Sequence, residues 1–321
     1  MPRFFFLLLL TVAMNGPVFP QGDGPILRRA LPRELSHHGC RQAHLPVQAL
    51  LARRSSAADG NFDMSGSLAR SDSFDITHYG LELDVTAASS LQVTGSAHIT
   101  FETLEPGANN LWFDLEGSLD VDSLSLDGVT WAFDQIGDSV FVSAPDGGWQ
   151  PAGPQVVGLH YHGQPGKDPY WGGMYLTGDY IFSLGIGLTT IPPNHGKAWY
   201  PCFDQFRERS AYTYGITSAG GKRFHGQGHL VQTDSLGGDT IRRVFDMPQP
   251  IPTYLSAIAV ADYQDWDTTH VGTYGEVPIR LTAKAANLNL MKNRFADLGV
   301  CIDALEDWWG PHAWERVGYV I

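Results

Sequence analysis

The chain has 321 residues, of which 43% are hydrophobic, and it contains 36 glycines and 20 prolines. At about 100–200 residues per domain, this length predicts two domains, and the composition supplies a buried core and many turns. The formal net charge is −13, which argues against nucleic acid or an anionic membrane as a partner, because both attract basic surfaces.

The amino terminus has the pattern of an export signal. A short basic start at residues 1–3 precedes an uninterrupted apolar run over residues 4–14. This run is too short for a bilayer core, which needs roughly twenty residues, but it suits the apolar region of a secretory signal. We therefore expect a signal peptide over residues 1–20 and a secreted, periplasmic or cell-envelope location. No later stretch is apolar enough for us to expect a transmembrane anchor.

Residues 21–70 show no periodicity and are rich in Arg, Ser, Ala and Gly. We expect this segment to be a disordered leader or linker. It contains Cys40 close to His37, His38 and His44, a grouping that superficially resembles a metal-binding tract. The surrounding sequence is polar and irregular, so we expect no metal there.

Residues 71–267 predict a domain built almost entirely of strands. Apolar and polar residues alternate over residues 79–85 and 91–101, which is typical of half-buried strands. The Asp127-Gly128 dipeptide between two short apolar runs predicts a hairpin turn. Further strands are predicted over residues 111–115, 139–143, 156–161, 180–184, 212–217, 228–233, 240–245 and 254–262. This pattern indicates a mainly β fold, a large multi-stranded antiparallel sandwich or saddle.

Residues 268–321 predict the start of a different, α+β domain. After a hairpin over residues 268–282, apolar residues recur at every third or fourth position, which predicts one long helix over residues 284–309. The stripe consists of Leu288, Met291, Phe295, Leu298, Ile302, Leu305 and Trp309. Gly310-Pro311 ends the helix, and residues 317–321 predict a strand. Because such a stripe must be buried, we expect the rest of a second domain to pack on this helix.

The histidines do not form a zinc-binding helix motif. An H-E-x-x-H helix places two His side chains on one face, but none of the 12 His residues is followed by Glu. His160 and His162 would share one face of a strand, whereas His225 and His229 are separated by a glycine-rich segment. Without a third ligand, we favour ordinary strand positions for all four.

Several cysteine and aromatic residues are expected to be buried. We expect Cys202 and Cys301 to serve as small apolar core residues. A group of aromatic residues can be interpreted either as packing within a β domain or as a stacking face for sugars or peptides, and we favour packing. This group consists of Trp171, Tyr175, Trp199, Tyr200 and Phe203.

Two segments have a more specific pattern than alternation. Residues 199–217 read WYPCFDQFRERSAYTYGIT and residues 250–263 read PIPTYLSAIAVADY. The Pro, Cys, Asp, Thr and Tyr residues of these segments, in these positions, resemble the sequence of the amino-terminal β domain of the aminopeptidase N family of zinc metallopeptidases (gluzincins). The resemblance extends to SDSFDITHYGLELDV, LQVTGSAHITF and VVGLHYHGQP at residues 71–85, 91–101 and 156–165. VPIRLTAK and HAWERVGYVI, at residues 277–284 and 312–321, resemble the beginning of the family's thermolysin-like catalytic domain.

The resemblance implies a function for the complete protein. Family members hold zinc on an H-E-x-x-H helix and hydrolyse peptides with zinc-activated water. This chain ends before that motif, at Ile321. The resemblance therefore implies the amino-terminal, substrate-side portion of an exported zinc metallopeptidase, which by itself binds no zinc and is inactive.

The resemblance also directs attention to residues 188–195. In the family, a Gln or Glu just before the Pro-Cys-Phe-Asp corner holds the α-amine of the substrate. This stretch contains no Gln, Asp or Glu here, and its polar residues Thr189, Thr190, Asn194 and His195 are the substrate-side candidates. Residues 196–198 (Gly-Lys-Ala) replace the family's Arg-rich approach to the corner. These departures predict altered substrate specificity.

Two other classes of function remain open at this point. One is a secreted β-sandwich module that binds cell-surface glycans or proteins and has no catalytic part. The other is an enzyme of different chemistry built on the β domain. The second is disfavoured because no acid, base and nucleophile cluster in the sequence.

Overall fold

The computed structural model describes residues 70–177, 179–190 and 192–321. The predicted signal peptide, almost all of the predicted leader and the Cys40 tract lie outside the described residues. Among the described residues, no helix is both long and apolar enough to cross a membrane.

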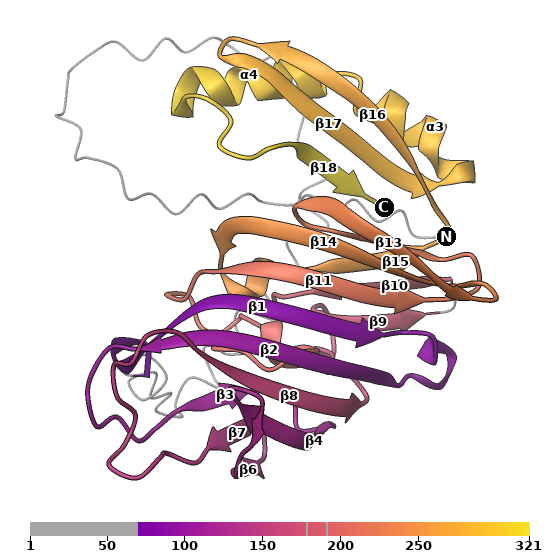
Figure 1. The fold of residues 1–321 in the computed structure, drawn as a ribbon. Coiled ribbons are helices and arrows are strands. Elements are labelled where there is room, and N and C mark those ends of the chain that lie inside the picture. Colours follow the sequence, from indigo (N-terminus) through magenta and orange to yellow (C-terminus); the bar gives the residue numbers. More distant parts are fainter. Residues whose placement is uncertain (1–69, 178, 191) are drawn as a thin grey trace, which may run out of the picture. The chain divides into compact units, whose positions relative to one another are not determined.

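The largest element is an eight-stranded sheet with the strand order β13-β14-β11-β1-β2-β8-β4-β5. Figure 1 shows β14, β11, β1, β2 and β8 running side by side. Its strands are β1 (Phe74–Asp84), β2 (Val93–Thr103), β4 (Leu119–Leu126), β5 (Val129–Thr130), β8 (Gln155–Gly163), β11 (Ser210–Ser218), β13 (His229–Gly237) and β14 (Thr240–Ile251). The β1–β11 pair is parallel, and the other neighbouring pairs of this sheet are antiparallel. The mainly β fold predicted from the sequence is therefore confirmed.

Two smaller sheets complete the β part. A four-stranded sheet has the order β12-β15-β10-β9, and a three-stranded sheet has the order β3-β7-β6. Their strands are β3 (Trp112–Asp114), β6 (Phe133–Ile136), β7 (Ser139–Val142), β9 (Gly173–Thr177), β10 (Tyr180–Leu184), β12 (Arg223–Gly226) and β15 (Ile258–Ala261). Short 3₁₀ helices are η1 (Ala88–Ser90), η2 (Gly196–Ala198) and η3 (Thr253–Leu255). One continuous apolar core draws side chains from all three of these sheets.

Period-two alternation explains which side chains of β1 enter this core. Phe74 and Ile76 are buried at even positions, whereas Tyr79, Leu81 and Leu83 are buried at odd positions. The change of phase coincides with a bulge after Ile76, where the pairing of β1 with β2 shifts register. An extra residue at a bulge moves the following side chains to the other face of a strand, so the apolar side stays inward along the whole of β1.

The predicted hairpin turn is also present. Asp127 has φ 49° and Gly128 has φ 82°, and they join β4 to β5, which pair antiparallel. Positive φ at both central positions matches the twist of the flanking strands, and Asp-Gly tolerates it at low cost. Strands β6, β9 and β12 were not predicted.

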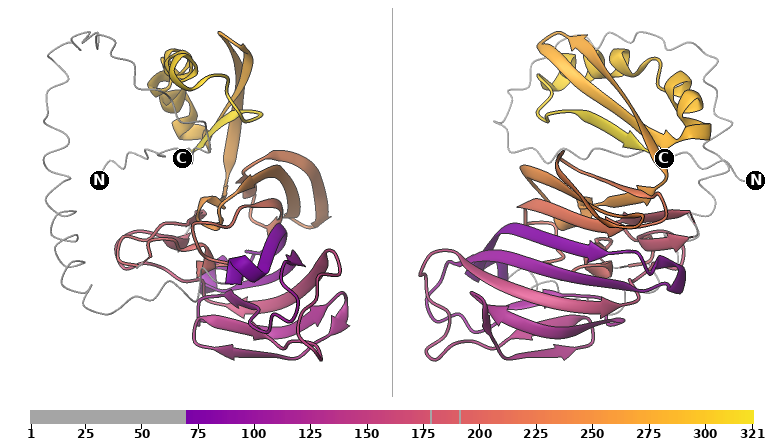
Figure 2. Two further views of the ribbon diagram at one scale, coloured as in Figure 1. Left: turned by 90° about the vertical axis from the view of Figure 1, so that its left-hand side faces the viewer. Right: turned by 45° about the vertical axis from the view of Figure 1, so that its right-hand side comes forward.

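The carboxy-terminal part has its own sheet and its own core. Strands β16 (Tyr263–Gly272) and β17 (Gly275–Lys284) form an antiparallel hairpin, and β18 (Val317–Val320) adds to β17 in parallel. Figure 2 shows the helices α3 (Ala285–Arg294) and α4 (Leu298–Trp309) on one face of this sheet. The buried core consists of Val277, Ile279, Leu281, Ala283, Met291 and Ile302. The predicted domain boundary at 267/268 lies within β16.

The prediction of one long helix over residues 284–309 is wrong. The structure has two helices, α3 and α4, because a turn interrupts the backbone pattern where the Leu298 amide donates to the Phe295 carbonyl at 3.0 Å. The regular spacing of three and four residues continues across this turn, so spacing alone does not reveal the break. The first five stripe residues contact the carboxy-terminal core. The last two, Leu305 and Trp309, are 56% and 61% exposed.

The two cysteines that the structure describes differ in their surroundings. Cys202 is fully buried, as expected, whereas Cys301 is exposed on α4. The expectation for Cys301 was wrong, because Ile302 takes the inward position and one helical step rotates Cys301 toward solvent.

Candidate functional site

The aromatic corner that carries the sequence resemblance is a packed structural element. Trp199, Tyr200 and Phe203 are fully buried, and the rings of Trp199 and Tyr200 lie 4.5 Å apart between centroids. Tyr161 Oη donates to the Trp199 carbonyl at 3.0 Å, and the Phe203 amide donates to Tyr79 Oη at 3.0 Å. For these three aromatic residues, packing is confirmed over a stacking face.

Trp171 and Tyr175, the other two aromatic residues considered, are half-buried near the surface. Tyr175 stacks on Phe182 with a centroid distance of 4.8 Å. Its hydroxyl accepts a hydrogen bond from the Gly172 amide at 3.1 Å. Tyr175 therefore supports the hairpin of β9 and β10.

A buried carboxylate joins the two segments on which the family resemblance rests. Asp204, in the Pro-Cys-Phe-Asp corner, accepts hydrogen bonds from Thr253 Oγ1 at 3.1 Å and from the Lys197 amide at 3.2 Å. Thr253 belongs to the Pro-Thr-Tyr-Leu turn and is 1% exposed. Burial, and next the charge of Asp114, raises the pKa of Asp204. Asp204 of one segment and Thr253 of the other thus meet at one buried hydrogen bond. This contact explains why the alternation of apolar and polar residues did not account for the residue types at these two positions.

Thr189 and Thr190 are organised around another buried carboxylate. Asp168 is 1% exposed and accepts from the Thr189 amide at 2.7 Å, from Thr189 Oγ1 at 2.6 Å and from the Thr190 amide at 3.2 Å. The amides of Tyr170 and Trp171 donate to its other oxygen at 2.9 and 3.0 Å. Burial alone would raise the pKa of Asp168, but these donors outweigh it and lower the pKa to about 2. Asp168 therefore ties residues 168–171 to the loop that carries both threonines.

This network predicts a specific acid sensitivity. The pKa of Asp168 is lower in the folded chain than its ordinary value of 3.8, so its contribution is complete above that value and is lost as the pH falls through about 2. In Asp168→Asn, an NH₂ group replaces one of the two oxygens that accept hydrogen bonds, and this group cannot accept from the donors that face it. We expect it to lower the free energy of unfolding by about 2 kcal/mol at neutral pH.

Urea unfolding at several pH values measures this effect. The difference between the wild type and Asp168→Asn should shrink as the pH falls below 3.8 and through about 2, because the carboxyl group becomes protonated first in the unfolded and then in the folded chain. A difference that stays constant with pH would show that the ionised carboxylate of Asp168 is not what holds the loop.

The other two predicted candidates, Asn194 and His195, lie beneath the surface. They are 5% and 3% exposed. Asn194 Nδ2 donates to the Asp204 carbonyl, and the His195 amide donates to the Gly185 carbonyl at 2.6 Å. His195 Nε2 lies 3.7 Å from a carboxylate oxygen of Glu116. Within the part of the chain that the structure describes, Asn194 Oδ1 and His195 Nδ1 have no hydrogen-bond partner.

The four candidates therefore divide into two groups. Thr189 and Thr190 sit on a loop held by Asp168, while Asn194 and His195 belong to the buried support of the corner. Sequence reasoning missed Asp168 and Glu116 as partners, because each lies in an irregular segment far along the chain from the residue it contacts. Asp204 was signalled by the corner motif, although its hydrogen-bond partners were not.

The described residues do not provide a zinc site. Among residues 70–177, 179–190 and 192–321, no group of three or more His, Cys, Asp and Glu side chains could hold a metal ion. His162 Nδ1 pairs with Asp122 at 2.9 Å and His225 Nε2 pairs with Asp265 at 3.0 Å. The residues of this part of the chain therefore do not fit the metal that the family resemblance implies.

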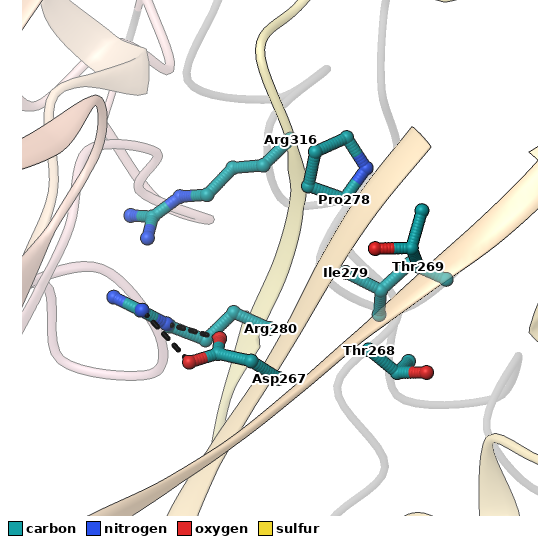
Figure 3. Close-up of a pocket in the computed structure, with 7 residues that line it drawn as sticks. All are labelled: Asp267, Thr268, Thr269, Pro278, Ile279, Arg280 and Arg316. Atoms are coloured by element: carbon teal, nitrogen blue, oxygen red, sulfur yellow. Dashed lines mark hydrogen bonds and ion pairs between the residues drawn. The ribbon is translucent and has the colours of Figure 1, made fainter. Parts of the chain in front are cut away.

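A pocket of about 340 Å³ lies elsewhere, on the carboxy-terminal sheet. Figure 3 shows its lining side chains, which come from β16, β17 and the residue that precedes β18. They are Asp267, Thr268, Thr269, Pro278, Ile279, Arg280 and Arg316.

Comparisons with known proteins show what the chain resembles. No protein-family model matches it, and no curated protein matches it. Among solved structures, an M1 zinc metallopeptidase from Deinococcus radiodurans is similar with 21% identity and a TM-score of 0.68, covering 77% of this chain and 56% of that protein. A mutant of that enzyme bound to a Tyr-Ser-Ala substrate gives the same values.

A second enzyme has the same kind of similarity. Legionella pneumophila aminopeptidase A, in complex with aspartic acid, has 16% identity and a TM-score of 0.65, and the match covers 77% of this chain and 28% of that one. The chain thus has the fold of part of the M1 zinc metallopeptidases, which confirms the resemblance found in its sequence. It spans 56% of the length of the Deinococcus structures that it matches.

Proposed function

We propose that the chain is the amino-terminal, substrate-side portion of an exported zinc metallopeptidase of the aminopeptidase N type. The observation that carries this proposal is the fold shared with M1 zinc metallopeptidases, at a TM-score of 0.68 over 77% of the chain. The hydrogen bond between Asp204 and Thr253 supports it, because it joins the two segments whose sequences resemble that family. Export rests on the predicted signal peptide over residues 1–20.

In this proposal the zinc ion is bound by a part of the complete protein other than the described residues. Zinc would supply the activated water that attacks the peptide bond. The described residues of this chain hold no metal-binding group, and the role proposed for them is to form the wall of the substrate cleft and its support. Asp168 fixes the loop of Thr189 and Thr190, and Asp204 fixes the corner behind it.

The peptide substrate is proposed from the relatives. The Deinococcus enzyme has been captured with a Tyr-Ser-Ala substrate. Residues 188–195 of this chain contain neither an acidic residue nor Gln, and a buried Asn194 and His195 replace an exposed acceptor for an α-amine. We therefore propose that the complete enzyme accepts peptides but depends less on a free amino terminus than an aminopeptidase does.

Helix α4 supplies a surface for the remainder of the catalytic domain. Val300, Leu305, Trp308 and Trp309 are 68%, 56%, 81% and 61% exposed. Exposed apolar groups of this size on one helix are characteristic of an interaction surface. The solved relatives are longer than this chain, which covers 56% of the first of them, and we propose that the additional chain of the complete enzyme packs on the segment 284–309.

A hydrolysis assay tests the proposal. We expect purified residues 1–321 to bind no stoichiometric zinc and to leave both aminoacyl and internally quenched peptides uncleaved. The complete natural gene product should bind zinc and cleave the quenched peptides, with loss of activity on chelation. Zinc-dependent turnover by residues 1–321 alone, well above the buffer rate, would contradict the division of roles proposed here.

A further inference from the structure

The pocket on the carboxy-terminal sheet brings two guanidinium groups together. Arg280 lies on β17, opposite Asp267 of β16 on one side and opposite Gly318 of β18 on the other. A Cβ atom at Gly318 would have only the Arg316 side chain near it, at 4.0 Å. Figure 3 shows the side chains of Arg280 and Arg316 extending to the same side of the sheet. The two guanidinium groups therefore flank an open position on this sheet.

The charges of the two arginines are balanced differently. Arg280 Nε and Nη2 donate to the two carboxylate oxygens of Asp267 at 2.7 and 2.9 Å, so this guanidinium is neutralised. Arg316 Nη2 donates to the Gly226 carbonyl at 3.2 Å. Within the part of the chain that the structure describes, no carboxylate lies within 4.0 Å of the Arg316 guanidinium. The charged side chains that line the pocket, two arginines and one aspartate, therefore have a formal charge of about +1, in a chain whose formal net charge is −13.

Burial makes the positive charge of Arg316 costly. Desolvation, and next the charge of Arg280, lowers the pKa of Arg316. The charges of Asp265, Asp267 and Glu315 raise the pKa of Arg316 and so offset part of this lowering. An anion beside Arg316 would offset both the desolvation and the repulsion.

We infer that this pocket binds a carboxylate group, with the Arg316 guanidinium as its main partner and Arg280 Nη1 as a second donor. The planar guanidinium fork matches a carboxylate. A monoanion matches the formal charge of the lining side chains, whereas a doubly charged phosphate would exceed it. Pro278 and Ile279 supply an apolar wall for the aliphatic part of the ligand. This inference does not depend on the proposed function.

Arg316 also has a structural role. Its hydrogen bond to Gly226, the pairing of Glu315 with His229 at 2.8 Å and the contact of Trp314 with the main core all attach residues 314–316 to the β part. If this attachment were the whole role of Arg316, the pocket would bind no carboxylate. The test therefore measures binding directly.

Binding is measured on purified residues 1–321 by calorimetry or NMR, with trialanine, trialanine amide and butyrate as probes. We expect trialanine to bind and its amide to bind about tenfold more weakly or not at all, because the amide removes the charged acceptor. Butyrate that binds as well as trialanine would identify a free carboxylate as the ligand; weaker binding of butyrate would identify a peptide terminus. No binding of either carboxylate would overturn the inference.

Three variants locate the site. Arg316→Gln should lower the affinity for trialanine about tenfold. Asp267→Asn should raise this affinity severalfold, because the substitution frees Arg280 from its carboxylate partner. Arg294→Gln removes one positive charge from helix α3, at a residue that does not line the pocket, and should leave the affinity for trialanine unchanged. Equal losses in Arg316→Gln and Arg294→Gln would show non-specific attraction and overturn the site. Should Arg316→Gln fail to fold by circular dichroism, the gain expected in Asp267→Asn decides, and its absence overturns the inference.

Discussion

Replacing Trp199 with alanine is expected to lower the free energy of unfolding by about 4 kcal/mol, because truncating a buried Trp loses its transfer free energy and leaves a cavity. Trp199 is fully buried, and its ring contacts that of Tyr200. Its backbone carbonyl, which accepts from Tyr161 Oη, is retained in the alanine variant, so the expected loss comes from the side chain. The measurement is urea unfolding followed by circular dichroism.

Trp308→Ala is the matched control for this experiment. Trp308 is 81% exposed on α4, so its truncation should change the free energy of unfolding by less than about 0.5 kcal/mol. If both variants lost similar stability, the corner would not be part of the cooperative core, and its assignment as a packing element would fail.

Gly228→Ala is the second substitution with a large expected effect. We expect it to lower the free energy of unfolding by about 3 kcal/mol, through positive φ and steric overlap together. Gly228 has φ 74°, and a Cβ atom there would lie 1.8 Å from the Asp246 carbonyl oxygen. This oxygen belongs to the backbone of β14, so side-chain rotation gives no relief. The backbone would have to move at the start of β13.

Gly221→Ala separates the two contributions. Gly221 has nearly the same φ, 75°, but open space where the Cβ atom would be. The Gly221→Ala variant should therefore have a free energy of unfolding only about 1 kcal/mol lower than the wild type, which is the cost of positive φ alone. Thermal and urea unfolding of the two variants in parallel provide the comparison, and equal losses would refute a steric role for the close approach at Gly228.

Much of the fold follows from local pattern. The alternation along β1 and β2 predicted buried faces, and Asp127-Gly128 predicted a turn, because both features depend on neighbouring residues. The parallel pairing of β1 with β11 did not follow, since it joins His78 to Ala211 and similar distant pairs. Two helices in place of one also escaped prediction, because the apolar spacing is continuous across Phe295.

The candidate site was predicted less completely than the fold. The resemblance led to Thr189, Thr190, Asn194 and His195, and the structure shows two of them on a supported loop and two in the buried interior. Their partners are contributed by distant irregular segments, whose positions depend on the tertiary structure. The formal positive charge of the pocket around Arg316 likewise becomes visible only when β16, β17 and β18 lie side by side.

The downstream coding sequence, read from the codon after that for Ile321, tests the central claim most directly. If this chain is the substrate-facing part of a zinc peptidase, the reading frame continues and encodes a helix with the pattern H-E-x-x-H. A stop codon soon after Ile321, or a long continuation without that pattern, would contradict the account and favour a secreted binding module.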